Sequence, residues 1–126
     1  MQTERIAKFN ERDVNMKKIV LSDANTILIP VMNSITKFAM GESDIFLHFK
    51  LQDLDTIQKL LCKYVNWVEN GKNLTLFDIS ENIHDFMGIS VEFLEFNFGF
   101  FSQSRKILQR INGQLSETKE IKDQKN

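Results

Sequence analysis

The sequence predicts an all-α fold, a small domain of about four to five helices with a helix-turn-helix-like hairpin near residues 76–101. Apolar residues recur at helical spacing through most of the chain, and four of the five glycines fall where a predicted helix ends. Only residues 73–79 alternate like a short strand, and that alternative stays open. A chain of 126 residues suffices for one domain, which we place at residues 19–113.

The two ends of the chain are predicted to lie outside the helical core. Residues 1–18 are polar with a faint helical pattern, so we expect a flexible extension. Residues 114–126 contain few apolar residues, so we expect a disordered tail. The charged start lacks a signal peptide's apolar segment, and no apolar run is long enough to span a bilayer. We therefore expect a cytoplasmic protein with no membrane association.

Two helices are predicted in the first half of the domain. The first begins near Ile29, because Pro30, the only proline, is best tolerated in a first helical turn, and it ends at Gly41. The second is capped by Asp53 or Asp55 and ends at Gly71. Both helices carry an apolar face with the i, i+3, i+4 spacing of a buried surface.

The second half of the domain is predicted to hold the helical hairpin. Thr75 can cap a helix by accepting a hydrogen bond from the backbone amide of Asp78, and Gly88 would end that helix. Ser90 would then cap a final helix that continues to Gly113. A short turn with glycine between two amphipathic helices is typical of a helix-turn-helix unit.

Direct DNA reading by this hairpin is not expected. Its second helix would present Glu92 and Glu95 outward, with no Arg, Lys, Asn or Gln before Asn97. Base recognition relies on such donors, and carboxylates repel phosphates. The net charge is −1, from 16 basic and 17 acidic residues, so the basic excess of a nucleic-acid-binding domain is missing. We expect DNA to be reached only indirectly, through a partner.

The final predicted helix is unusually rich in phenylalanine. A helix that is apolar on two sides is normally buried on two sides. This pattern favours a subunit interface over a simple core, and it predicts a protein partner and a homo-oligomer, taken as a dimer. The predicted interface residues are Phe93, Phe96, Phe98, Phe100 and Phe101.

The only basic cluster of the chain follows on the same helix, at Arg105, Lys106 and Arg110. These cations are candidates for contact with nucleic acid or with an acidic partner. Cations near a helix C-terminus also complement the helix dipole, and that alternative stays open.

No group of residues with the spacing of a catalytic or metal site is present. His48 and His84 lie far apart, each without a cysteine or second histidine at metal-binding spacing. Cys62, the single cysteine, is flanked by apolar residues and excludes an internal disulfide. No glycine-rich phosphate loop occurs. We therefore expect a protein that is not an enzyme and that has no metal or cofactor.

Three stretches resemble one known family in pattern and order. They are DANTILIPVMNSITKFAM, LQDLDTIQKLL and FGFFSQSRKILQRI, which together span roughly residues 23 to 112. In this pattern the chain resembles the FlhD family of bacterial transcriptional co-activators. The resemblance implies a helical homodimer that joins a second, zinc-containing subunit to activate promoters and binds DNA weakly alone.

The sequence therefore predicts a small helical regulatory protein that acts on transcription through a partner. One alternative is an adaptor, chaperone or inhibitor that binds a partner protein and has no DNA role. A second alternative is a small sensory domain, because NLTLFDISENIHDFMGISVEFLE loosely resembles the strand-then-helix segment of PAS sensors.

Overall fold

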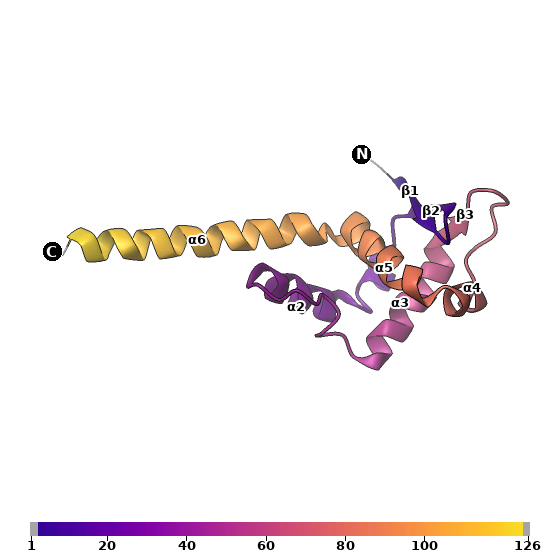
Figure 1. Cartoon of the computed structure of the whole chain (residues 1–126), viewed down its shortest axis with the longest axis horizontal. Coiled ribbons are helices and arrows are strands. Elements are labelled where there is room, and N and C mark those ends of the chain that lie inside the picture. The colour runs from indigo at the N-terminus through magenta and orange to yellow at the C-terminus, as the bar shows by residue number, and fades with distance from the viewer. Residues whose placement is uncertain (1–2, 125–126) are drawn as a thin grey trace.

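A computed structural model describes the backbone of residues 3–124 and the side chains of residues 3–113. Within these residues the chain forms three strands and six helices (Figure 1). The elements are β1 (Glu4–Phe9), β2 (Arg12–Lys17), α1 (Leu21–Ala24), α2 (Leu28–Ala39), α3 (Leu51–Tyr64), β3 (Val65–Trp67), α4 (Leu76–Glu81), α5 (Ile83–Phe98) and α6 (Phe100–Gln124). The fold is therefore mixed α/β, and the all-α prediction is wrong.

The sheet begins with a hairpin in the segment that was expected to be a flexible extension. β1 and β2 pair antiparallel, and Asn10 and Glu11 form the tight turn between them with positive φ angles of 52° and 61°. Such a turn matches the twist of paired strands. The inward positions alternate at Ala7, Phe9, Val14 and Met16. Small Ala7 weakens this alternation, so the sequence by itself indicates only a polar segment with a faint helical pattern.

The third strand continues directly from helix α3. β3 pairs antiparallel with β2, placing Val65 opposite Met16 and Trp67 opposite Val14. The sequence predicted that this helix would continue to Gly71. Valine and tryptophan favour extended backbone, and pairing with β2 gives them a buried face, so the helix ends at Tyr64 instead.

One face of the sheet packs against the helices and forms the core. Phe9, Val14 and Met16 are fully buried. The Phe9 ring lies 5.8 Å from the Trp67 ring, centroid to centroid. On the edge of this face, the Arg12 guanidinium stacks over Trp67 at 4.1 Å. The other face of the sheet is open, with Ile6 57% exposed.

The predicted helix-turn-helix hairpin is absent, because Gly88 lies inside the continuous helix α5. A glycine inside a helix costs only about 1 kcal/mol relative to alanine, which tertiary packing readily offsets. The chain bends instead at Asn82, before α5, and at Gly99, after it. Thr75 caps α4 as predicted, since its hydroxyl accepts a hydrogen bond from the Asp78 amide at 3.1 Å.

Residues 73–79 do not form the strand that the sequence left open as an alternative, and only Asn73 takes part in strand-like pairing. Asn73 forms an isolated bridge with Asn66, and the chain becomes helical at Leu76.

A carboxylate ties the short helix α1 to the end of α3. Asp23 accepts hydrogen bonds from the Lys63 ammonium at 2.8 Å and from the Tyr64 hydroxyl. These two donors hold the pKa of Asp23 below its ordinary value, the lysine contributing most.

Helix α6 lies alongside α2 and then continues beyond it, away from the sheet (Figure 1). It has 25 residues and α2 has 12, so at about 1.5 Å per residue it is roughly twice as long. The tail that was expected to be disordered begins at residue 114. Its backbone continues helix α6 as far as Gln124.

Candidate protein-binding surface

The direction of α6 is set by a sharp joint with α5. Gly99 adopts the left-handed conformation (φ 62°, ψ 44°) that ends α5, and its amide donates to the Glu95 carbonyl at 2.9 Å. The Glu95 carboxylate then accepts a hydrogen bond from the Phe101 amide at 2.5 Å, at the first turn of α6. A negative charge at this position also complements the helix dipole. Glu95 is therefore a capping residue for α6.

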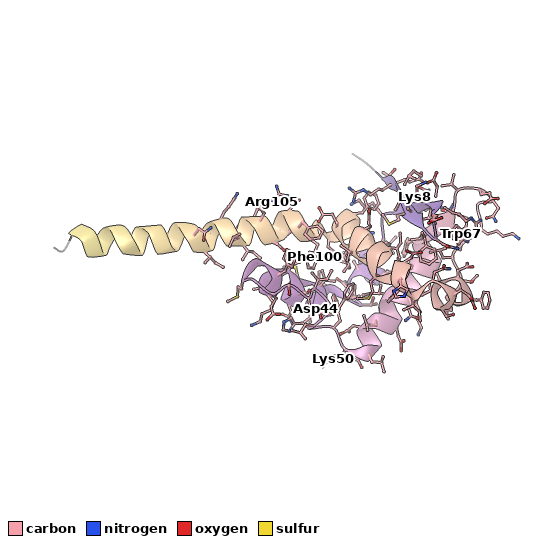
Figure 2. All side chains as sticks on the ribbon, in the orientation of Figure 1. Lys8, Asp44, Lys50, Trp67, Phe100 and Arg105 are labelled. Atoms are coloured by element: carbon pink, nitrogen blue, oxygen red, sulfur yellow. The ribbon has the colours of Figure 1, made fainter. Side chains whose placement is uncertain are left out.

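An aromatic cluster joins α6 to α2. The rings of Phe38, Phe100 and Phe101 lie 5.5 to 5.7 Å apart, centroid to centroid, in edge-to-face arrangements. Phe100 is fully buried, whereas Phe101 is 36% exposed. Figure 2 shows Phe100 where α6 begins, between α5 and α2. The buried Ser104 hydroxyl adds a polar link to the carbonyls of Ile35 at 3.3 Å and Phe100 at 2.8 Å.

A shallow trough follows the contact between α2 and α6. It consists of two hollows of about 290 and 460 Å³ that share Phe38, Ala39 and Leu108. Phe101 and Arg105 line one end of it, and Met40, Gly41 and Ile111 line the other. The lining is mainly apolar, as in sites that receive the apolar face of a helix.

The outer face of α2 extends this apolar surface. Leu28, Met32 and Met40 are 38%, 48% and 63% exposed. Leu28 and Met32 are one turn apart on the helix, Met40 follows at its C-cap, and Ile29 lies beside Leu28 at 73% exposure. Contiguous exposed apolar surface of this kind marks interaction sites.

The two helices that border the trough are also positively charged, and Arg105 is the cation that lines it. Helix α2 and residues 100–113 of α6 together carry four cations and no carboxylate; the cations are Lys37, Arg105, Lys106 and Arg110. The ion pairs among the described side chains lie elsewhere, at Lys8–Asp13, Arg12–Glu69 and Lys63–Asp23. The rest of the chain holds 12 basic and 17 acidic residues, so the charge is unevenly distributed.

The phenylalanines predicted to form an interface are divided between the core and the surface. Phe93, Phe96 and Phe100 are buried within the chain, so a partner cannot contact them without rearrangement. Phe98 is half-buried against the core, and Phe101 is partly exposed at the trough. Phe96 is covered by the hairpin: the Lys18 ammonium lies 4.1 Å from its ring centroid and donates to its carbonyl.

The predicted basic cluster is exposed on the part of α6 that lies beside α2. Arg105 lines the trough together with Phe38 and Ala39 of α2. Lys106 and Arg110 are exposed on the same helix. All three side chains are therefore free to meet an acidic group.

The residues considered for catalysis are dispersed. His48 lies in the loop before α3, and His84 lies on the exposed side of α5. Cys62 is half-buried on α3, where burial, followed by the charge of Asp78, raises its thiol pKa. Among the described residues, no three His, Cys, Asp or Glu side chains cluster in a way that suits a metal ion.

Sequence reasoning missed the outer face of α2. The available signal was its charge content, because Lys37 is the only charged residue among the 12 of α2. A helix with apolar residues on most of its circumference is usually covered on more than one side.

No protein-family model, curated protein or solved structure matches the chain. The resemblance to the FlhD family therefore stays a prediction. In the part of the chain that the structure describes, none of the helices has both the length and the apolar composition of a membrane span.

Proposed function

We propose that this protein works by binding another protein chain along the α2–α6 trough. The observation that carries the proposal is the exposed apolar row of α2, which continues through Met40 into the trough lined by Leu108 and Ile111. Anchors spaced by three or four residues on a partner helix fit such a surface. The protein would then act as an adaptor, chaperone or regulator, with binding as its activity.

Rigid support for this surface favours a binding role. The aromatic cluster and Ser104 hold α6 against α2, while Gly99 and Glu95 set the angle at which α6 leaves the core. A site on well-packed helices needs little ordering when a partner arrives, so less of the binding free energy is lost.

Partner-dependent regulation of transcription is a narrower form of the same proposal. Helices α4 and α5 hold five carboxylates and no lysine or arginine, which disfavours direct DNA contact there. The exposed cations of α2 and α6 support contact with an acidic group, either on a protein or on nucleic acid. The identity of the partner decides between a transcriptional regulator and an adaptor.

Site-specific photocrosslinking in the native cell tests the proposal. A benzophenone amino acid replaces Leu108, which is 42% exposed in the trough, or Ile6, which is 57% exposed on the open face of the sheet. We expect a discrete covalent adduct from position 108 and none from position 6. Equal labelling at the two positions, or none at either, would overturn the proposal.

Mass spectrometry of the adduct then separates the two forms of the proposal. A subunit of the transcription machinery supports the regulator, and any other protein supports the adaptor, chaperone or inhibitor.

A further inference from the structure

Two asparagines of this chain are followed directly by glycine, at Asn70–Gly71 and at Asn112–Gly113. In such a pair the glycine amide nitrogen can attack the side-chain carbonyl carbon of the asparagine, because glycine has no side chain to obstruct the approach. The outcome is spontaneous deamidation, which consumes water and requires no enzyme. The backbone around each pair decides whether this attack can occur in the folded protein.

The first pair lies in an exposed turn between β3 and α4, where Asn70 and Gly71 are both accessible to solvent. Gly71 has a left-handed φ of 73°, which a residue with a side chain adopts only under strain. The turn therefore requires the same glycine that makes Asn70 reactive. Apart from the chain neighbours of Gly71, no atom lies within 4 Å of the place where a Cβ would stand, so water reaches this position.

A hydrogen bond orients the Asn70 side chain for the reaction. Its Oδ1 accepts from the Lys72 amide at 2.9 Å, which closes an Asx turn. This bond folds the side chain forward along the backbone and brings its carbonyl carbon toward the Gly71 nitrogen that lies between. Negative charge develops on Oδ1 during the attack, and the Lys72 amide is the donor that stabilises this charge.

The second pair is held in a helix. Asn112 and Gly113 lie inside the continuous helix α6, Phe100–Gln124. Attack at this position would pull the Gly113 amide out of the helical hydrogen-bond pattern, and helix formation is cooperative, so bonds on both sides would be disturbed. At the first pair, the Gly71 amide must leave only its bond to the Trp67 carbonyl, at 2.8 Å. An exposed turn opens locally at a lower free-energy cost than the middle of a helix.

We infer that Asn70 is a site of spontaneous deamidation in the folded protein and that Asn112 is protected. The Gly71 amide gives its proton to solvent, and its nitrogen forms a bond to the Asn70 side-chain carbonyl carbon. The bond from that carbon to the side-chain nitrogen then breaks, and ammonia leaves with a proton returned by solvent. Water opens the resulting cyclic imide at either carbonyl, which produces aspartate or isoaspartate at position 70.

Both products change the turn in charge, and one changes it in length. Each adds a carboxylate next to Glu69, whose own carboxylate pairs with Arg12 at 2.7 Å, so a like charge is introduced beside an ion pair. Isoaspartate also inserts a methylene group into the main chain. This insertion falls within the turn that is closed by the backbone bonds from Gly71 to Trp67 and from Trp67 to Lys72. We therefore expect isoaspartate to loosen the end of β3.

Peptide mapping by mass spectrometry tests the inference on the full chain. The protein is incubated in mildly alkaline buffer, either folded or in denaturing urea, and the conversion of amide to carboxylic acid is followed at both positions. In the folded protein Asn70 should react at least about tenfold faster than Asn112, because only Asn112 requires a helix to open. In urea the two positions should react at similar rates, because the fold no longer separates them.

Two variants of the next residue test the role of the Lys72 amide. Lys72→Pro removes the amide hydrogen, whereas the matched control Lys72→Ala keeps it. In the folded protein only Lys72→Pro should slow deamidation at Asn70, by at least about threefold, which is less than for a buried oxyanion donor because this turn is exposed. Equal rates in the two variants would refute the role of the amide. Equal rates at Asn70 and Asn112 in the folded wild type, or an Asn70 that reacts only in urea, would refute the inference itself.

Discussion

The two ends of this molecule place similar apolar residues in opposite environments. In the sheet, Phe9, Val14 and Met16 are fully buried against the helices. On α2, Leu28, Met32 and Met40 are 38% to 63% exposed. The first group stabilises the fold, whereas the second remains available to a partner. Apolar residues in the same chain are therefore covered at one end of the molecule and exposed to solvent at the other.

Charge follows the same division. At the sheet end, two of the five cations, Lys8 and Arg12, form ion pairs within the chain, with Asp13 and Glu69. The four cations of α2 and α6 have no carboxylate on their own helices up to Gly113. The comparison shows that the α2–α6 end leaves both apolar side chains and cations exposed to solvent.

Truncating one side chain at each end gives the largest expected contrast. Phe93→Ala removes a ring that is 1% exposed in the core next to the sheet, and should reduce the free energy of unfolding by about 3–5 kcal/mol. Leu108→Ala, at 42% exposure, should cost less than about 1 kcal/mol. Urea unfolding at one low protein concentration measures both. Similar losses would show that the two ends do not differ as described.

Two glycines, one inside α5 and one at its end, should respond to substitution by alanine with changes of opposite sign in the free energy of unfolding. Gly99→Ala forces a side chain into the left-handed region (φ 62°) and should lower the free energy of unfolding by about 1–2 kcal/mol. Gly88→Ala lies inside α5 with no atom within 4 Å of the new methyl group, and should raise it by about 0.5–1 kcal/mol. Thermal or urea unfolding measures both changes. Destabilisation by Gly88→Ala would contradict the continuous helix.

The polar link between α2 and α6 predicts a smaller effect. Ser104→Ala removes the buried hydroxyl that donates to the Ile35 and Phe100 carbonyls, and should cost about 1 kcal/mol. Ser102→Ala, on the exposed side of the same turn, is the matched control and should change little. Urea unfolding compares the two variants. Equal effects would mean that the hydroxyl does not contribute to the packing of α6.

The contact between α1 and α3 predicts the smallest effect on stability, which is present at neutral pH and disappears in acid. The native pKa of Asp23 is lowered by Lys63 and Tyr64, so Asp23 contributes stability above its ordinary pKa of about 4. That contribution is lost as the pH falls through the lower native pKa. Asp23→Asn should therefore lower stability at neutral pH and weaken its decline below about pH 4.

Unfolding measured between pH 7 and pH 2 checks this prediction. Asp55→Asn, an exposed carboxylate on α3, serves as the control and should leave the acid decline unchanged. An unaltered decline in Asp23→Asn would show that this contact does not bear on stability.

Local signals in the sequence predicted several helix boundaries correctly. The first long helix begins beside Pro30 and is followed by Gly41, whose φ is 104°. The Thr75 cap forms as expected. Such features depend on the backbone of a few neighbouring residues, so a short stretch is enough to identify them.

The failures share one cause, which is dependence on residues far away in the chain. Residues 4–17 form strands because β3, from residues 65–67, completes their sheet and the helices cover one face. Gly88 looks like a turn glycine in isolation, but α5 packs on the core along its whole length and continues through it. Neither fact is encoded within the segment itself.

The candidate site shows the same limit. The excess of phenylalanine in residues 93–101 correctly drew attention to this part of the chain. However, only packing against α2 and the hairpin decides that Phe93, Phe96 and Phe100 are buried while Phe101 reaches the trough. The exposed row on α2 was missed, because a buried and an exposed apolar face look alike in a periodic pattern.

By itself, the sequence determined where α2 begins and ends and where α4 begins, because caps, proline and glycine act on the adjacent backbone. It also determined that α2 and the start of α6 contain lysine and arginine but no aspartate or glutamate. Helices α4 and α5 contain aspartate and glutamate but no lysine or arginine. The tertiary structure alone decided which apolar faces are covered. Burial depends on contacts between distant segments, and in this chain those contacts leave one face of α2 and one face of α5 open to solvent.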